Sequence, residues 1–216
     1  MPRTPPHPSN QRCITVALFL QRFCNAFSSY LCGVMESKIT LRRATGADAR
    51  FIAENVLRAL HIDETDDRHI NHLADISRRD DTLYSWRNAT IALYDGVPAG
   101  LMVAYDGARY RRMRDITFPM IRKYVGDDYY NMDDESCPGE YYLDSLAVLP
   151  EFQRSGIASA LIREMFRQRD EAGIPLATIL VDPDNETAYS LYAKNGFRHE
   201  GRIRVFGTTY DRLVCP

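Results

Sequence analysis

The segment that most constrains the fold is Leu146–Leu161, LAVLPEFQRSGIASAL. It closes an apolar run, passes Pro150 into a short polar turn, and resumes at Gly156 with apolar residues at helical spacing. The run predicts a buried strand over 141–149, and the spacing predicts a helix over 156–169. A buried strand joined to a helix by a short turn is a building unit of α/β folds.

The turn itself has the residues of an anion site. A helix that starts here leaves free main-chain N–H groups, and the helix dipole favours negative charge at that end. Gly156 has no Cβ and admits close approach to the main chain, Ala158 and Ser159 keep the next turn small, and Arg154 adds positive charge. The turn therefore suits a pyrophosphate, although by itself it is more simply explained as an ordinary helix start, because short glycine patterns often occur by chance.

Hydrophobic periodicity predicts the other elements. Segment 108–139 reads as an irregular insert with one short helix ending near Ile121, and the other segments alternate between strands and helices in the order β-α-α-β-β-insert-β-α-β-α-β-β. This order predicts an α/β (α+β) fold with both antiparallel and crossover connections. The expected strands are 38–44, two within 88–107 that turn at Asp95-Gly96, 175–182, 202–207 and 208–214, and the further helices are 49–60, a weaker one in 61–80, and 185–195.

Residues 1–34 differ from the rest in composition. MPRTPPHPSN has four prolines in ten positions, and the apolar run that follows is interrupted and too short to span a membrane. These residues carry three arginines and no acid, against 24 basic and 29 acidic residues afterwards. We expect an extension outside the fold, disordered or arising from a misplaced start, with a targeting segment as the alternative, and a single domain over 35–216.

Charge and cysteine content limit the partners. The net charge of −2 does not favour a nucleic-acid surface, and no membrane partner is expected. After residue 34 only Cys137 and Cys215 remain, with no CxxC and no Cys/His cluster, so neither a disulfide framework nor a metal site is predicted. A cytoplasmic setting is expected on the same ground.

Two motifs resemble those of the GNAT superfamily of N-acetyltransferases. Gln153-x-x-Gly156-x-Ala158 is similar to its Q/R-x-x-G-x-G/A signature, with alanine where glycine is commoner. NETAYSLYAKNGF, 185–197, resembles its second motif, and one helix and one strand separate the two, as in the superfamily. The resemblance covers 141–197 as motif and 38–212 as element order. It implies a mixed, mostly antiparallel central sheet flanked by helices.

The resemblance also implies acetyl-CoA as co-substrate. In the superfamily the strand before the turn splays from its neighbour, and main-chain groups there bind pantetheine; by motif position these belong to Leu146, Ala147 and Val148. Gln153 would shape the pyrophosphate loop, Ser159 would add a hydroxyl, and Asn185 would contact the pantetheine arm or serve only as a helix N-cap. The implied pyrophosphate-binding amides are those of Arg154, Ser155, Gly156, Ile157 and Ala158.

Three side chains are candidates for catalysis. The superfamily uses a tyrosine at the position of Tyr192 to protonate the departing thiolate, although a tyrosine there could simply pack in the core. A protonated amine needs a base. Strand alternation would put Glu140, Tyr142, Asp144 and Leu146 on one face. Asp144 is the first candidate, with a structural hydrogen bond to a neighbouring loop as the alternative, and Glu140 is the second. The amide near Leu146 would stabilise the oxyanion.

The acceptor side is the least defined. Acidic residues and tyrosines of 124–141 could line a site for a cationic amine under a lid formed by 108–139, but such loops are more often merely solvated. We expect transfer of an acetyl group to a primary amine. A small molecule is the favoured acceptor, and a peptide is the second choice. The alternative is a non-catalytic CoA-binding sensor, and a homodimer is left open. Another nucleotide-binding α/β fold is disfavoured because its phosphate-binding motifs are missing.

Overall fold

The computed structural model describes residues 38–62, 66–126 and 132–216. Residues 38–216 form one compact unit. The expected extension, 1–34, and the acidic pair Asp127-Asp128 lie outside the described residues. None of the described helices is long and apolar enough to span a bilayer.

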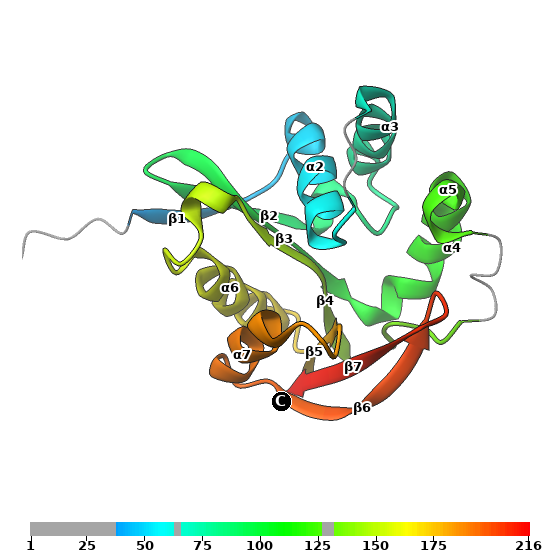
Figure 1. The fold of residues 1–216 in the computed structure, drawn as a ribbon, viewed down its shortest axis with the longest axis vertical. Helices are drawn as coiled ribbons and strands as arrows, with labels where there is room; N and C mark the ends of the chain where they lie inside the picture. The colour runs from blue at the N-terminus through cyan, green and yellow to red at the C-terminus, as the bar shows by residue number, and fades with distance from the viewer. Residues whose placement is uncertain (1–37, 63–65, 127–131) are drawn as a thin grey trace, which may run out of the picture. The chain divides into compact units, whose positions relative to one another are not determined.

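A seven-stranded sheet organises the described part of the chain, in the order β1-β2-β3-β4-β5-β7-β6 (Figure 1). Neighbouring strands are antiparallel except β4 and β5, which are parallel. This confirms the mixed, mostly antiparallel α/β fold expected from the sequence. The strands are β1 (Ile39–Arg43), β2 (Ala89–Tyr94), β3 (Val97–Asp106), β4 (Glu140–Val148), β5 (Leu176–Val181), β6 (Arg198–Val205) and β7 (Thr208–Cys215).

Helices cover both faces of this sheet (Figure 1), with α2 and α3 on one side and α6 and α7 on the other. Short 3₁₀ turns join several elements: η1 (Gly46–Asp48), η2 (Trp86–Asn88), η3 (Gly107–Arg109) and η5 (Pro150–Phe152). The helices are α2 (Ala49–Ala59), α3 (Asp67–Arg78), α4 (Tyr110–Met120), α5 (Arg122–Val125), α6 (Ile157–Glu171) and α7 (Glu186–Lys194).

The insert is more helical than its sequence indicated. α4 runs for 11 residues through the basic stretch that we expected to be irregular. It buries Tyr110, Met113, Thr117 and Phe118, which recur at helical spacing. The arginines between them and Pro119 near the helix end hide this period in the sequence, so the prediction for this segment was wrong.

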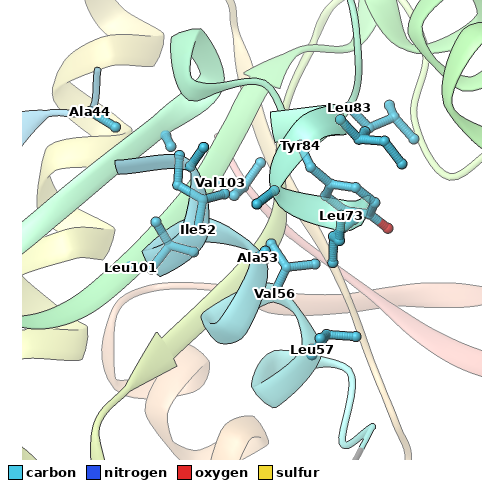
Figure 2. Packing of buried hydrophobic residues seen from close by; sticks show 14 of the residues in the cluster. Ala44, Ile52, Ala53, Val56, Leu57, Leu73, Leu83, Tyr84, Leu101 and Val103 are labelled. Carbon is cyan, nitrogen blue, oxygen red and sulfur yellow. The ribbon is translucent and has the colours of Figure 1, made fainter. Parts of the chain in front are cut away.

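Each face of the sheet has its own hydrophobic core. On one face, Ile52, Ala53 and Val56 of α2 pack toward Leu101 and Val103 of β3 (Figure 2). On the other face, the core includes Leu161 and Met165 of α6 with Leu143 of β4 and Ile179 of β5. The sheet is therefore fixed from both sides, and the main-chain positions at its centre are set by packing.

Candidate active site

The parallel strands β4 and β5 separate partway along their length. They pair only from Glu140 with Leu176 to Leu143 with Ile179. Beyond that point β5 continues its pairing with β7 and β4 continues its pairing with β3. The second half of β4 therefore presents an edge without a neighbouring strand in the middle of the sheet, and main-chain donors and acceptors on that edge are available to a ligand.

A β-bulge marks the point of separation. Ser145 pairs with Val103 and Leu143 with Ala104, so Asp144 is the extra residue on β4. The bulge shifts the alternation of side chains by one residue. Leu143 lies in the core on the α6 side, and Leu146 packs against the same core. Our expectation that Asp144 and Leu146 share a face was therefore wrong, because simple alternation does not continue through a bulge.

The alternation of main-chain groups identifies which residues face the open edge. Leu149 N–H donates to Ala99 O at 2.9 Å, toward β3. In an antiparallel pair, main-chain groups two residues apart point to the same side, so those of Ala147 also point to β3. The groups of Leu146 and Val148 then point to the open edge. Of the three residues expected to supply main-chain contacts, Ala147 is the one turned away.

The turn between β4 and α6 has an unusual backbone. Arg154 and Gly156 have φ values of 59° and 93°, in the left-handed region. Glycine adopts this region without a steric cost, and a Cβ at position 156 would find only Ile39 Cδ1, at 3.8 Å. Gln153, Arg154 and Gly156 are exposed, and the Ser155 hydroxyl donates to Phe152 O at 2.5 Å and closes the turn.

This turn leaves a run of main-chain donors without acceptors. The first helical bond of α6 runs from Ala160 N–H to Gly156 O, and Gly156 receives no side-chain cap. Within the described residues, no acceptor is found for the N–H groups from Arg154 to Ser159. Consecutive free amides at the start of a 15-residue helix fit a phosphate group well. The pyrophosphate of coenzyme A thus has a suitable cradle at the turn predicted from the sequence.

Two further contacts shape this end of the site. The Asn185 side chain accepts a hydrogen bond from Ala188 N–H at 3.0 Å, which confirms the predicted N-cap of α7. Asn195, at the other end of α7, donates to the Ser159 hydroxyl oxygen at 3.3 Å. The second contact ties α7 to the first turn of α6 and leaves the Ser159 hydroxyl proton free to donate.

Tyr192 of α7 is buried, with 7% of its surface exposed, and its ring lies edge-on to Phe197 at 5.8 Å. It belongs to the α6-side core, against which Leu146 also packs. Its hydroxyl has no hydrogen-bond partner among the described residues, yet every fully buried polar side-chain atom there has one, so this hydroxyl must reach solvent. Burial raises the pKa of Tyr192, and the hydroxyl therefore keeps its proton at neutral pH.

Asp144 points to the opposite face of the sheet. Its carboxylate accepts hydrogen bonds at 2.8 Å from the Tyr105 and Ser145 hydroxyls. Burial raises the pKa of Asp144, and the two hydrogen bonds offset this only in part. A carboxylate with a raised pKa at the point where β4 loses its neighbour is suited to take a proton from an amine. Tyr192 and Asp144 thus lie on opposite faces of the sheet.

Glu140, the second candidate base, has a different environment. Its buried carboxylate forms an ion pair with Arg212 of β7 at 2.8 Å and accepts hydrogen bonds from Ser136 at 3.1 Å and Cys137 N–H at 3.3 Å. Burial alone would raise its pKa, but the hydrogen bonds from Arg212 and Cys137 outweigh burial and lower it. A carboxylate held in this way is a poor base. These contacts favour a structural role for Glu140, and its role as a base stays a prediction.

The acidic residues just before β4 have different partners. Asp134 is neutralised by Arg111 and Arg114 of α4, and Asp133 accepts a hydrogen bond from Arg204 N–H at 3.0 Å. Glu135 instead accepts hydrogen bonds from the Tyr110 and Tyr142 hydroxyls at 3.0 and 2.9 Å. The sequence did not single out Glu135 from its neighbours, since nothing in its local pattern distinguishes a residue that turns inward.

Fold and site together define a class: α/β proteins in which two diverging parallel strands and the following helix N-terminus can receive one elongated anionic ligand. A family model described as "Acetyltransferase (GNAT) family" matches residues 54–197, well over half of the chain. The chain therefore belongs to the GNAT acetyltransferase family. This confirms the family that the two sequence motifs indicated.

Known relatives agree with this assignment. Over 70 residues the chain is 39% identical to a mycothiol acetyltransferase of Nocardiopsis dassonvillei, a match that covers 32% of this chain and spans only 21% of that protein's length. An N-acetyltransferase from Staphylococcus aureus Mu50 superposes with a TM-score of 0.66 at 20% identity, over 81% of this chain and 99% of that one. An aminoglycoside acetyltransferase in complex with coenzyme A superposes with a TM-score of 0.56 at 19% identity, over 82% of this chain and 93% of that one. These structures share the fold.

Proposed function

We propose that this protein is an acetyl-CoA-dependent N-acetyltransferase that acts on a primary amine of a small molecule. The observation that carries the proposal is the pair of unlike groups beside the open edge of β4. Tyr192, a protonated hydroxyl without a hydrogen-bond partner among the described residues, lies on the α6 side, and Asp144, a carboxylate with a raised pKa, lies on the other side. An acid and a base on opposite sides of one gap suit a transfer between two substrates that enter from opposite faces.

In this proposal the co-substrate lies along the open edge. The free amides from Arg154 to Ser159 hold the pyrophosphate, with added charge from the exposed Arg154 side chain. Main-chain groups of Leu146 and Val148 hold the pantetheine arm, and the side-chain amide of Asn185 is available beside it. Acetyl-CoA then supplies the acetyl thioester at the point where β4 and β5 separate.

The remaining chemistry is assigned to three groups of this chain. Asp144 accepts the proton of the incoming ammonium, so that the neutral amine can attack the thioester carbonyl. The Leu146 N–H stabilises the oxyanion that develops on that carbonyl. As the C–S bond breaks, Tyr192 donates its proton to the departing thiolate. The nitrogen of the tetrahedral intermediate releases its second proton to solvent, the Tyr192 phenolate takes a proton back from solvent, and the products are an N-acetylated amine and free coenzyme A.

The test measures release of free thiol from acetyl-CoA in the presence of a panel of primary amines. We expect amine-dependent release, with kcat lower by about 100-fold in Tyr192→Phe and Asp144→Asn. Tyr189→Phe, a change at an α7 tyrosine outside the assigned roles, serves as the control and should retain activity. Binding of acetyl-CoA without any amine-dependent release would identify a non-catalytic binding module and refute the proposed catalysis.

A further inference from the structure

A cluster of carboxylates and tyrosines adjoins the proposed base. We call it the acidic-tyrosine cluster: Glu135, Asp144, Tyr84, Tyr105, Tyr110 and Tyr142. Glu135 joins Tyr110 of α4 to Tyr142 of β4, and the Tyr142 ring lies edge-on to Tyr105 at 5.8 Å. Tyr105 in turn donates to Asp144. The four tyrosines are buried, whereas both carboxyl residues keep part of their surface exposed. The cluster is therefore not sealed on all sides, because two of its residues are partly exposed.

Neither carboxylate is neutralised by an ion pair among the described residues, although the charge of nearby Arg114, which pairs with Asp115 and Asp134, lowers the pKa of Glu135. Within the described residues, Glu135 and Asp144 accept hydrogen bonds only from hydroxyl groups and form no ion pair. Their neighbours in sequence are treated differently, since Asp134 meets two arginines and Glu140 meets Arg212. Two largely buried carboxylates without a counter-ion are costly in the folded protein. A bound cation would remove that cost.

Tyr84 is a buried tyrosine whose hydroxyl has no protein partner among the described residues. It lies in the turn before η2 and is 7% exposed, with its ring beside Leu73 and Leu83 (Figure 2). Its hydroxyl has no hydrogen-bond partner among the described residues and must therefore reach solvent. Burial and then the charges of Asp144 and Glu135 raise the pKa of Tyr84, so both carboxylates act electrostatically on this hydroxyl. Tyr84 thus contributes an unused hydrogen-bonding group within the field of the two carboxylates.

We infer that the acidic-tyrosine cluster binds the acceptor as an ammonium ion. Glu135 selects positively charged acceptors over those that carry a carboxylate, and the Tyr84 hydroxyl is an added hydrogen-bonding partner. This inference rests on the proposed function and narrows its substrate class. Aromatic rings around a cation add favourable interactions, and paired carboxylates repel an anionic acceptor. The favoured acceptors are small aliphatic or aromatic amines without a carboxylate, and amino acids are disfavoured.

Three probes of similar length test whether a carboxylate on the acceptor is disfavoured: 1,4-diaminobutane, butylamine and 4-aminobutanoate. We expect kcat/KM for either carboxylate-free amine to exceed that for 4-aminobutanoate by at least about tenfold. In Glu135→Gln, KM for butylamine should rise about 10- to 100-fold with kcat changed less than about threefold, and the discrimination against 4-aminobutanoate should shrink. Tyr84→Phe should raise KM by about three- to tenfold. Asp133→Asn is the matched control, because Asp133 is exposed and asparagine can still accept the hydrogen bond from Arg204 N–H.

Binding of the probes separates this inference from the proposed function. Calorimetry of 1,4-diaminobutane with the CoA-bound protein, which cannot turn over, should give binding that Glu135→Gln weakens by the same factor. A folded Glu135→Gln variant with unchanged KM and selectivity, or no diamine binding to the CoA complex, would overturn the inference while leaving acetyl transfer intact. Failure to bind acetyl-CoA at all would instead refute the proposed function, and the inference with it.

Discussion

Replacement of Glu140 by glutamine tests whether this residue supports the fold or the chemistry. The carboxylate is buried at the first residue of β4, where Arg212 donates from Nη2 at 2.8 Å and from Nη1 at 3.3 Å. Ser136, the N–H and thiol of Cys137, and the Thr178 hydroxyl also donate to this carboxylate. Glutamine keeps the size of the side chain and removes its charge. We expect the variant to be less stable and, once folded, to be active.

The structure sets the size of the effect. Removal of one partner from a buried ion pair costs about 3–5 kcal/mol. Arg212 retains a second partner, Glu200 at 2.6 Å, so the lower end, about 3 kcal/mol, is expected. For a unit of this size that corresponds to a Tm lower by about 6–12 °C. Since the folded pKa of Glu140 is lowered, its contribution is present above the usual pKa of about 4.3 and is lost as the pH falls through the folded value.

Thermal unfolding followed by circular dichroism measures the difference, at about pH 7.5 and again at about pH 4, where the gap between the two proteins should narrow. Glu200→Gln is the control, because its side chain is 47% exposed and its loss should cost less than about 1 kcal/mol. A Glu140→Gln protein with unchanged Tm would refute the structural role. A stable, folded variant that has lost acetyl transfer would restore Glu140 as a candidate base.

Three further predictions follow from single residues. Gly156→Ala should destabilise the protein by about 1–2 kcal/mol, because φ is 93° there, and should weaken acetyl-CoA binding; denaturant titration and calorimetry measure the two effects. Leu161→Ala should cost about 2–5 kcal/mol, because Leu161 is fully buried against the sheet, whereas Leu60→Ala at an exposed position should cost little. Burial and the charge of Asp144 raise the pKa of Glu135 to about 7, so the folded state retains a proton there that the unfolded state has lost. Stability should therefore fall as the pH rises from about 4.5 to about 7, and kcat/KM for a cationic amine should rise over the upper part of that range; Glu135→Gln should flatten the stability profile. The groups that face Glu135 and bear on this titration are Asp144, Tyr110, Tyr142 and Arg114.

Local patterns in the sequence predicted much of the fold. Hydrophobic periodicity gave the element order, and Asp95-Gly96 gave the turn between β2 and β3, where both residues have positive φ. The N-cap at Asn185 and the glycine turn before α6 were also predictable. These features depend on residues within a few positions of one another, because caps, turns and amphipathic faces are local in their physical origin.

The residues that make up the candidate site were harder to predict from the sequence. Asp144 and Leu146 lie on different faces because of one bulge, which depends on how β4 pairs with β3. Glu140 is neutralised by a residue 72 positions away, and Glu135 is distinguished from Asp134 only by which of them meets arginines. Tyr84 reaches the acidic-tyrosine cluster from a turn that carries no motif. Each of these facts involves a partner that is distant along the chain.

By itself, the sequence determined the element order and the turn at Gly156, because hydrophobic period and backbone freedom are properties of neighbouring residues. Only the tertiary structure decided the environments of the carboxylates: Glu140 and Asp134 form ion pairs, whereas Glu135 and Asp144 form none among the described residues. The physical reason is that the pKa of a carboxyl group depends on burial and on nearby charges, and both are set by residues that only folding brings together.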